Sequence, residues 1–499
     1  MKHRKHPDSP LYLQDHRRPV TRRELLAQGF MGGLGMVMAP TLLGMFGART
    51  ANAQTFVCSV RTGAGLIPFI VLDLAGGANI AGSNVLVGGP GGQLDLLTAE
   101  GYSKLGLPSS MTPGNPNQVN SEFGLRFHAD SAFVRGMVSK ASVAARAKTN
   151  GTIFAARSDN DTGNNPHNPM YGINKAGANG DLVALIGTDP SDSGGNSAAP
   201  MNMIDPTVRP TKVDSAKDAT GLVDTGNLVA SMNQTQAGQV AKAAEEITAL
   251  KLAKIAEDPN LEELIHCGYV QTADLISRFG NPDAVNPALD TDIVGAATSI
   301  FTAGEFNTAR FQKTAAVMKL VVEGYAGAGT IEQGGYDYHD GTRATGEDRD
   351  FQAGQMMGAV LEFAHRKNAP LALYVISDGS LSSNGMVDNS VGGRGKGQWT
   401  GDSSDTAATF MLVLDPRVAG QRPALTTATA NQVGYFRPNG SVETASSAVA
   451  NNVGLLAEAV VLNYLALHNR VSQFASVLPM NGLGSGASFD NLIAFTPIV

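Results

Sequence analysis

Several short apolar segments of the chain, each typical of a buried strand, end in acidic residues. Asp73 and Asp378 lie at the ends of two such segments, and a stretch with two glycines carries Asp337 and His339. In open α/β sheets, ligands bind beyond the carboxyl ends of the strands, so we expect these groups to converge. Asp337 and His339 would point to the same side of an extended backbone. A carboxylate and an imidazole on one face can bind a divalent cation such as zinc, and oxygen-only sites suit magnesium or calcium.

Each acid also has a structural interpretation, in which its carboxylate caps a helix or starts a turn. We prefer that interpretation for Asp415, which directly precedes a proline. For Asp378, which lies in Gly/Ser-rich sequence, both interpretations stay open. Gly334 and Gly335 shortly before Asp337 allow a close approach of the backbone, which favours a functional site there.

A long aperiodic stretch, 381–405, follows Asp378 and carries Arg394, Lys396 and the single tryptophan, Trp399. Loops of this length in compact domains are usually functional or disordered. The two basic residues could meet an anionic substrate, and the tryptophan could form a pocket wall. The alternative is a mobile surface loop.

The remaining candidates carry less information. The loop 159–167 brings hydroxyl, carboxylate and the imidazole of His167 together, so it could supply a nucleophile or a metal ligand, or simply form turns. His468 lies near the end of a predicted helix, where the helix dipole explains it better than metal ligation. The chain has neither a Gly-x-Ser-x-Gly elbow nor a Cys-x-x-Cys pair, so triad-hydrolase and thiol redox chemistry lose support.

Elements that alternate along the second half of the chain must position these groups. Apolar residues at helical spacing predict helices around 311–322, 356–363 and 453–467, and continuous apolar runs predict strands at 371–376 and 409–414. Helices alternating with fully apolar strands are typical of a mostly parallel central sheet with helices on both faces. We therefore expect an α/β fold with long surface loops.

The N-terminal 53 residues are predicted to be a signal peptide. Residues 21–26 resemble a twin-arginine signal, the apolar stretch 29–47 follows, and 51–53 offers a small-residue cleavage site. A transmembrane anchor is the alternative, but glycine and proline are too frequent for a lipid-spanning helix. The signal predicts export of a folded protein by the twin-arginine translocase to the bacterial periplasm or beyond.

The mature chain, 54–499, is predicted to be one α/β domain with a polar insertion near 187–235. Loss of the signal, with eight Lys/Arg and three Asp/Glu, takes the formal net charge from -7 to -12. This acidity argues against nucleic acid as a partner. No further apolar run is long enough to span a membrane, so no stable span is expected after cleavage. Cys58 and Cys267 could pair in an oxidising compartment, but the sequence leaves this open.

These motifs resemble a known family. The twin-arginine start, 72–79, the Gly-Gly-Tyr-Asp-Tyr-His element 334–339 and 377–378 resemble the exported bacterial family numbered 1501 among the domains of unknown function. That family is similar to the alkaline phosphatase and sulfatase superfamily, in which acids and histidines at sheet ends hold one or two metals beside a Ser or Thr nucleophile. The resemblance implies an alkaline-phosphatase-like fold with these metal ligands: Asp73, Asp337, His339, Asp378 and Asp402.

The chain also departs from the family pattern. Where the family shows Ser-Glu-Phe-Gly-Arg-Thr, residues 377–382 keep the acid but lack the arginine. Where the family shows Asp-His after a Gly-rich segment, this chain has Asp402 without the histidine. No nucleophile transfers from the family.

Two functions follow from these observations. The first is an exported hydrolase of phosphate or sulfate esters that depends on a divalent metal, which could be zinc, magnesium, manganese or calcium. The metal would polarise the ester and activate a bound water or hydroxyl. The alternative is a non-catalytic periplasmic protein on the same fold, with a degenerate site, that binds a partner or a cell-envelope component.

Overall fold

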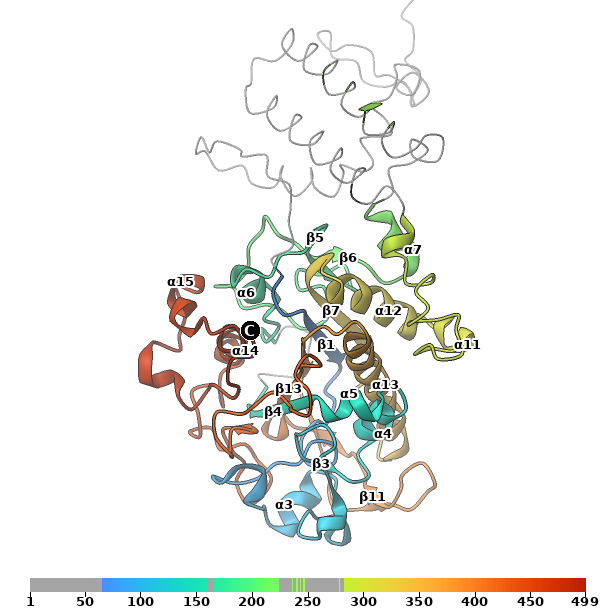
Figure 1. The fold of residues 1–499 in the computed structure, drawn as a ribbon. Helices are drawn as coiled ribbons and strands as arrows, with labels where there is room; N and C mark the ends of the chain where they lie inside the picture. The colour runs from blue at the N-terminus through green and yellow to red at the C-terminus, as the bar shows by residue number, and fades with distance from the viewer. Residues whose placement is uncertain are drawn as a thin grey trace, which may run out of the picture. The chain divides into compact units, whose positions relative to one another are not determined.

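An eight-stranded mixed sheet forms the centre of the structure (Figure 1). The computed structural model describes residues 65–158, 165–223 and 282–499, with a few isolated positions between 236 and 278. In spatial order the strands are β14 (Gln432–Val433), β4 (Thr149–Ala155), β13 (Ala408–Leu414), β8 (Leu371–Ser377), β1 (Phe69–Ala75), β7 (Ala326–Gly334), β5 (Val183–Gly187) and β6 (Thr211–Lys212). Within this sheet only β13 runs antiparallel to its neighbours.

The middle of the sheet confirms the strands expected from continuous apolar sequence. Both β8 and β13 are buried along their whole length, as the segments 371–376 and 409–414 predicted. Strand β1 lies between β7 and β8 and pairs in parallel with both. Such strands bury side chains on both faces, which is why their sequences are apolar without alternation.

Helices pack on the two faces of the sheet (Figure 1). One face carries α12 (Ala309–Val322), α13 (Ala344–Arg366), α4 (Ala132–Val138) and α5 (Val143–Ala147). The other face carries α14 (Val453–Leu467), α6 (Met170–Lys175) and α15 (Phe474–Val477). The predicted helices at 311–322 and 453–467 are confirmed, and the one at 356–363 is part of the longer α13. The α/β fold class, with a mostly parallel sheet, is therefore confirmed.

Side chains of β1 show how the two layers are built. Phe69 and Val71 belong to the core that the sheet shares with α14 and α6. The alternate residues Ile70 and Leu72 are equally buried and point to the opposite face, because successive strand side chains alternate. In the α14 layer, Phe69 meets the ring of Tyr464 edge-on at 5.6 Å.

Shorter elements lie outside the sheet core. They are α3 (Ala99–Lys104), α7 (Ala216–Gly221), α11 (Ala303–Phe306), β2 (Val119–Asn120), β3 (Phe127–His128), β9 (Leu381–Ser382), β10 (Val387–Asp388), β11 (Lys396–Gly397) and β12 (Gly401–Asp402). Strands β9 to β12 form two small hairpin-like pairs within 381–405, so this stretch is ordered.

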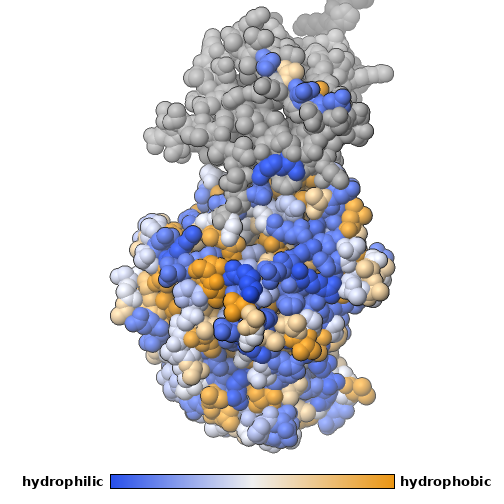
Figure 2. All heavy atoms as spheres, in the orientation of Figure 1, coloured by the Kyte–Doolittle hydropathy of each residue, from blue (hydrophilic) through white to orange (hydrophobic). Residues whose placement is uncertain are grey.

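Hydrophilic residues cover much of the face seen in Figure 2, with apolar residues in small groups between them, as is ordinary for a surface in water. Among the described helices, none combines the length and the apolar character that a membrane crossing requires. The predicted signal, 1–53, and both cysteines lie outside the described residues.

Candidate functional site

The register of three adjacent strands brings the predicted acids to one edge of the sheet. Asp73 of β1 lies opposite Glu332 of β7 and Ile376 of β8. Asp378 directly follows the last residue of β8, and Asp337 lies three residues after the end of β7. The predicted ligands thus reach the same edge, as expected, but they form two groups rather than one.

The first group is buried and centres on a serine hydroxyl. Ser197 Oγ lies 3.0 Å from Asp73 Oδ1, 3.2 Å from Asp378 Oδ1 and 3.0 Å from His167 Nε2. The Ser197 N–H also donates to Asp73 Oδ2 at 2.7 Å. These four side chains are almost fully removed from solvent. We call Asp73, His167, Ser197 and Asp378 the sheet-edge group.

Backbone turns hold Asp378 in place. The N–H of Gly76 donates to Asp378 Oδ2 at 3.1 Å, and the side-chain amide of Asn196 donates to the same oxygen. Gly76 has a φ of 122°, and a Cβ at this position would lie 2.6 Å from the backbone nitrogen of Asp337. A glycine is therefore required where the turn after β1 passes between the two groups of acids.

The electrostatics of the sheet-edge group are unusual for buried side chains. Burial, with repulsion from Asp378, raises the pKa of Asp73 to about 7. Burial lowers the pKa of His167 to about 4, so its imidazole is neutral at pH 7. No basic side chain among the described residues forms an ion pair with Asp73. The single proton of the Ser197 hydroxyl can be donated to only one of the two carboxylates at a time, and His167 Nε2 donates to or accepts from this hydroxyl according to its tautomer.

The second group is exposed and contains the remaining predicted ligands. His339 Nε2 lies 2.7 Å from Asp337 Oδ1 and 3.4 Å from Asp402 Oδ1. One ligand atom from each residue lies within 4.8 Å of the others. We call these three residues the exposed ligand group. Asp402 arrives from β12, which pairs with β9 just after β8.

Alternating tyrosines position Asp337 and His339. Tyr336 and Tyr338 are buried, while the residues between and after them are exposed, so the prediction that Asp337 and His339 share a side is confirmed. The Tyr338 hydroxyl donates to Asp350 Oδ1 at 2.8 Å and accepts the N–H of Asn79 at 3.0 Å. The exposed pair is therefore presented by an anchored segment.

The donor set of the exposed ligand group fits a divalent cation. One imidazole nitrogen with two carboxylate oxygens is a combination that zinc and manganese accept, and water would complete the coordination. Exposed acidic groups of this kind also occur without an ion, so the group alone does not identify a metal centre.

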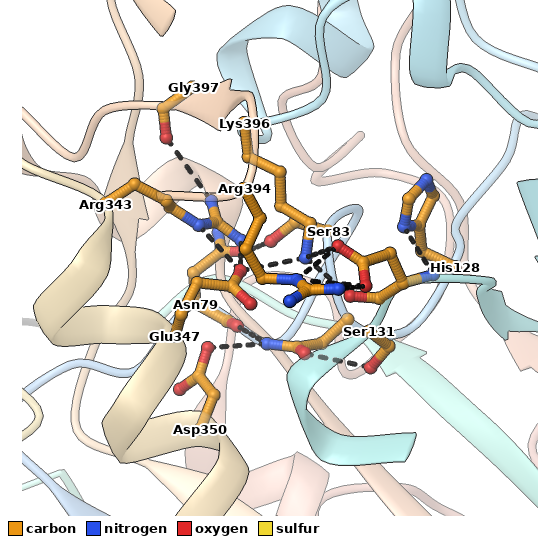
Figure 3. Close-up of polar contacts among 12 residues, drawn as sticks. Asn79, Ser83, His128, Ser131, Arg343, Glu347, Asp350, Arg394, Lys396 and Gly397 are labelled. Carbon is orange, nitrogen blue, oxygen red and sulfur yellow. Dashed lines mark hydrogen bonds and ion pairs between the residues drawn. The ribbon is translucent and has the colours of Figure 1, made fainter. Parts of the chain in front are cut away.

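Lys396 and Arg394 do not face a substrate. Lys396 is fully buried, and its Nζ lies 2.8 Å from Glu347 Oε1 and 2.6 Å from the carbonyl of Asp130 (Figure 3). Arg394 Nε donates to Asp130 Oδ2 at 2.8 Å. Both cations are thus engaged by acids of the chain, and the expectation of an anion site here is corrected.

Trp399 is a core residue rather than a pocket wall. Its ring is fully buried beneath the guanidinium of Arg343, with 4.4 Å from the Arg343 Cζ to the ring centroid. Arg343 Nη2 also lies 2.9 Å from Glu347 Oε1, one helical turn along α13. We call the following set the loop–helix network: Asp130, Arg135, Arg343, Glu347, Arg394 and Lys396.

Two further expectations concern polar residues with structural roles. Asp415 accepts the N–H of Arg417 at 3.1 Å and pairs with its side chain, so the structural interpretation is confirmed. His468 does not act through the helix dipole. Burial lowers its pKa, and the neutral ring accepts the N–H of Ile67 at 3.1 Å and donates to the Tyr464 carbonyl at 2.7 Å.

Ser197 and Asn196 are the site residues that the sequence did not reveal. They lie in the stretch predicted to be a polar insertion, whose first part is buried against β1. A Cβ at Gly195 would lie 2.5 Å from Asp73 Oδ2, so this glycine permits the close approach. The pair Gly194–Gly195 shortly before Ser197 resembles the two glycines before Asp337, and this pattern could have indicated a site residue. Residues 159–164 of the predicted loop 159–167 lie outside the described residues.

Comparison of the chain with protein-family models, with curated proteins and with solved structures finds no match.

Proposed function

We propose that this protein is an exported hydrolase of phosphate or sulfate esters that depends on a divalent metal, with its reaction centre at the carboxyl edge of β1, β7 and β8. The proposal rests on the neighbours of Ser197 Oγ. Asp73, Asp378 and His167 each place a side-chain atom within 3.2 Å of it. These residues come from distant parts of the chain and are buried together at the edge where ligands bind in open sheets.

Ser197 is the nucleophile in this proposal. Its oxygen forms a bond to the phosphorus or sulfur as the bond to the leaving ester oxygen breaks. His167 Nε2, neutral because burial lowers its pKa to about 4, accepts the hydroxyl proton and returns it to the leaving oxygen. Water then releases the phosphate or sulfate from the serine. Asp73 and Asp378 orient the hydroxyl from its other side.

Metal dependence follows from charge. Asp73 forms no ion pair within the described residues, so it would repel an anionic ester beside Ser197. The exposed ligand group offers Asp337, His339 and Asp402 for a divalent ion. Such an ion, when bound, polarises the ester and offsets negative charge. The twin-arginine start supports export by the twin-arginine translocase to the periplasm or the medium.

The alternative function is a non-catalytic periplasmic or envelope-associated protein on this fold. The observation in its favour is the burial of Ser197, whose exposed fraction is 0%. A nucleophile must contact its substrate. If Ser197 stayed buried, the protein would not catalyse ester hydrolysis and would bind a partner at another surface. The missing arginine and histidine of the family pattern favour the same alternative.

The purified protein should contain metal and hydrolyse esters. Metal content is measured by mass spectrometry after incubation with zinc, manganese, magnesium or calcium, and activity with p-nitrophenyl phosphate and p-nitrophenyl sulfate. The variants are His339→Ala and Ser197→Ala, and Asp348→Asn removes an exposed acid outside both groups as the control.

We expect His339→Ala to lose the metal and Ser197→Ala to keep the metal but lose hydrolysis, with Asp348→Asn unchanged. Thermal unfolding of each variant shows whether the fold is intact. Metal binding without hydrolysis of either ester would favour the binding protein. Protein that takes up no metal and cleaves no ester would overturn the proposal.

A further inference from the structure

A polar hollow lies at the outer edge of the sheet, beside β14. Its volume is about 370 Å³, and its walls come from the loop before β14, from residues 446–448 and from the C-terminal segment 488–493. This volume falls within the range of small-molecule pockets, roughly 300–1,000 Å³. None of the residues that line it belongs to the sheet-edge group or the exposed ligand group.

The walls of the hollow carry hydroxyl and amide groups but almost no charge. The lining includes Thr427, Thr429, Tyr435, Ser447 and Asn491, and Asp490 is the one charged residue in it. Most small-molecule pockets are lined mainly by apolar side chains. Hydroxyl and amide groups can each donate and accept hydrogen bonds, so these walls suit a ligand that does both.

Two serines point their hydroxyl groups toward a glycine in this wall. Ser446 Oγ accepts the N–H of Tyr435 at 3.1 Å, and the buried Ser447 Oγ has no hydrogen-bond partner among the described residues. Gly434 has a φ of 70°, and a Cβ there would lie 2.9 Å from Ser446 Oγ and 3.2 Å from Ser447 Oγ. Gly434 therefore allows both hydroxyls to pack directly against the backbone of this wall, where any larger residue would clash with them.

We propose that this hollow binds an uncharged carbohydrate. Sugar hydroxyls are donors and acceptors at once, which matches the serine, threonine and asparagine groups of the walls. Tyr435 offers an amphipathic ring for the apolar C–H face of a sugar. The lining contains no Lys or Arg, so an anion such as a phosphate ester finds no counter-charge here. The site is thus independent of the proposed ester hydrolysis.

Binding is tested by calorimetry on the full protein with methyl glucoside, N-acetylglucosamine, maltose and cellobiose, and with glucuronate, which is charged but not an ester, as the comparison. Thr429→Val replaces an exposed hydroxyl of the lining by a methyl group, and Tyr435→Ala removes the ring. Ser485→Ala, an exposed serine outside the lining, is the matched control. Thermal unfolding of each variant shows that it is folded.

We expect at least one neutral sugar to bind the wild type and Ser485→Ala alike. Either lining substitution should weaken that binding roughly tenfold or more, because a hydrogen bond or a stacking surface for the sugar is lost. Glucuronate should bind more weakly than the neutral sugars. The proposal is overturned if no neutral sugar binds, or if the two lining variants bind as tightly as the control.

Discussion

The sheet-edge group and the loop–helix network are both buried, but they handle negative charge in opposite ways. Burial alone would raise the pKa of Glu347, yet Arg343 and Lys396 outweigh it and the net shift is downward. Burial and Asp378 raise the pKa of Asp73 to about 7, and no basic residue is among the causes. The network therefore supplies its own counter-charge. The sheet-edge group leaves Asp73 to be neutralised by a proton or a ligand.

Asp350 shows that the contrast can arise within a single turn of helix. It lies three residues after Glu347 on α13, yet its partners are the neutral Asn84 Nδ2 at 2.7 Å and the Tyr338 hydroxyl at 2.8 Å. Burial raises the pKa of Asp350 to about 7. The group that faces each acid decides the direction of its pKa shift, since burial is common to Glu347 and Asp350.

The largest effect is expected from Glu347→Gln. This change leaves Lys396 and Arg343 buried without their shared carboxylate, and should lower the free energy of unfolding by about 3–5 kcal/mol. Urea unfolding at pH 7 measures it. Glu443→Gln, which removes the exposed partner of Arg437, is the control and should shift the midpoint little. If Glu347→Gln lowered the free energy of unfolding no more than the control, the buried ion pairs of the network would stabilise the fold no more than an exposed pair.

A pH profile tests Asp350. Because its pKa is about 7 in the folded protein and 3.8 in the reference state, the folded state holds the proton more tightly. Its ionisation therefore reduces the free energy of unfolding as the pH rises from about 4 to 7. Asp350→Asn cannot ionise, so between pH 5 and pH 8 the wild type should lose about 2–3 kcal/mol relative to this variant. Asp348→Asn is the exposed control on the same helix. Parallel profiles for wild type and Asp350→Asn would contradict the shifted pKa.

Asp73→Asn should raise the free energy of unfolding, whereas Glu347→Gln should lower it. An amide at position 73 keeps an acceptor for the Ser197 N–H and can donate to Ser197 Oγ, while one of two crowded carboxylates disappears. In chelator at pH 8 we expect the free energy of unfolding to rise by about 1 kcal/mol, and in protein supplied with metal we expect ester hydrolysis to be lost. Urea unfolding and the activity assay measure the two effects. Destabilisation as large as that of Glu347→Gln would remove the distinction between the regions.

Local patterns were enough to predict the elements but not their arrangement. Continuous apolar sequence identified β8 and β13, and helical spacing identified α12 and α14, because these signals lie within one element. The antiparallel direction of β13 could not be predicted. It depends on pairing with β4 and β8, which lie far apart in the chain.

The site residues show the same distinction between local signals and contacts from distant parts of the chain. The alternation that places Asp337 and His339 on one side is local, and it was predicted. Ser197 lies 124 residues from Asp73, so only the folded chain brings its hydroxyl to the sheet edge. Lys396 was misassigned for the same reason. A lysine in a Gly-rich loop is typical of a solvated surface, but Glu347 and Asp130 are supplied by distant segments.

The smallest effect is expected at the outer end of the network, from Arg394→Ala. Arg394 pairs with Asp130 at the surface, with 39% of its side chain exposed, whereas Lys396 two residues later is fully buried. Water and salt screen the outer pair, so the change should cost less than about 1 kcal/mol and less still in 1 M salt. Lys396→Met should cost several times more and respond little to salt, because Glu347 then loses a buried partner. Equal losses from the two substitutions in urea unfolding would show that burial does not set the strength of these pairs. The contrast between the network and the sheet-edge group would then have to rest on the number of cations alone.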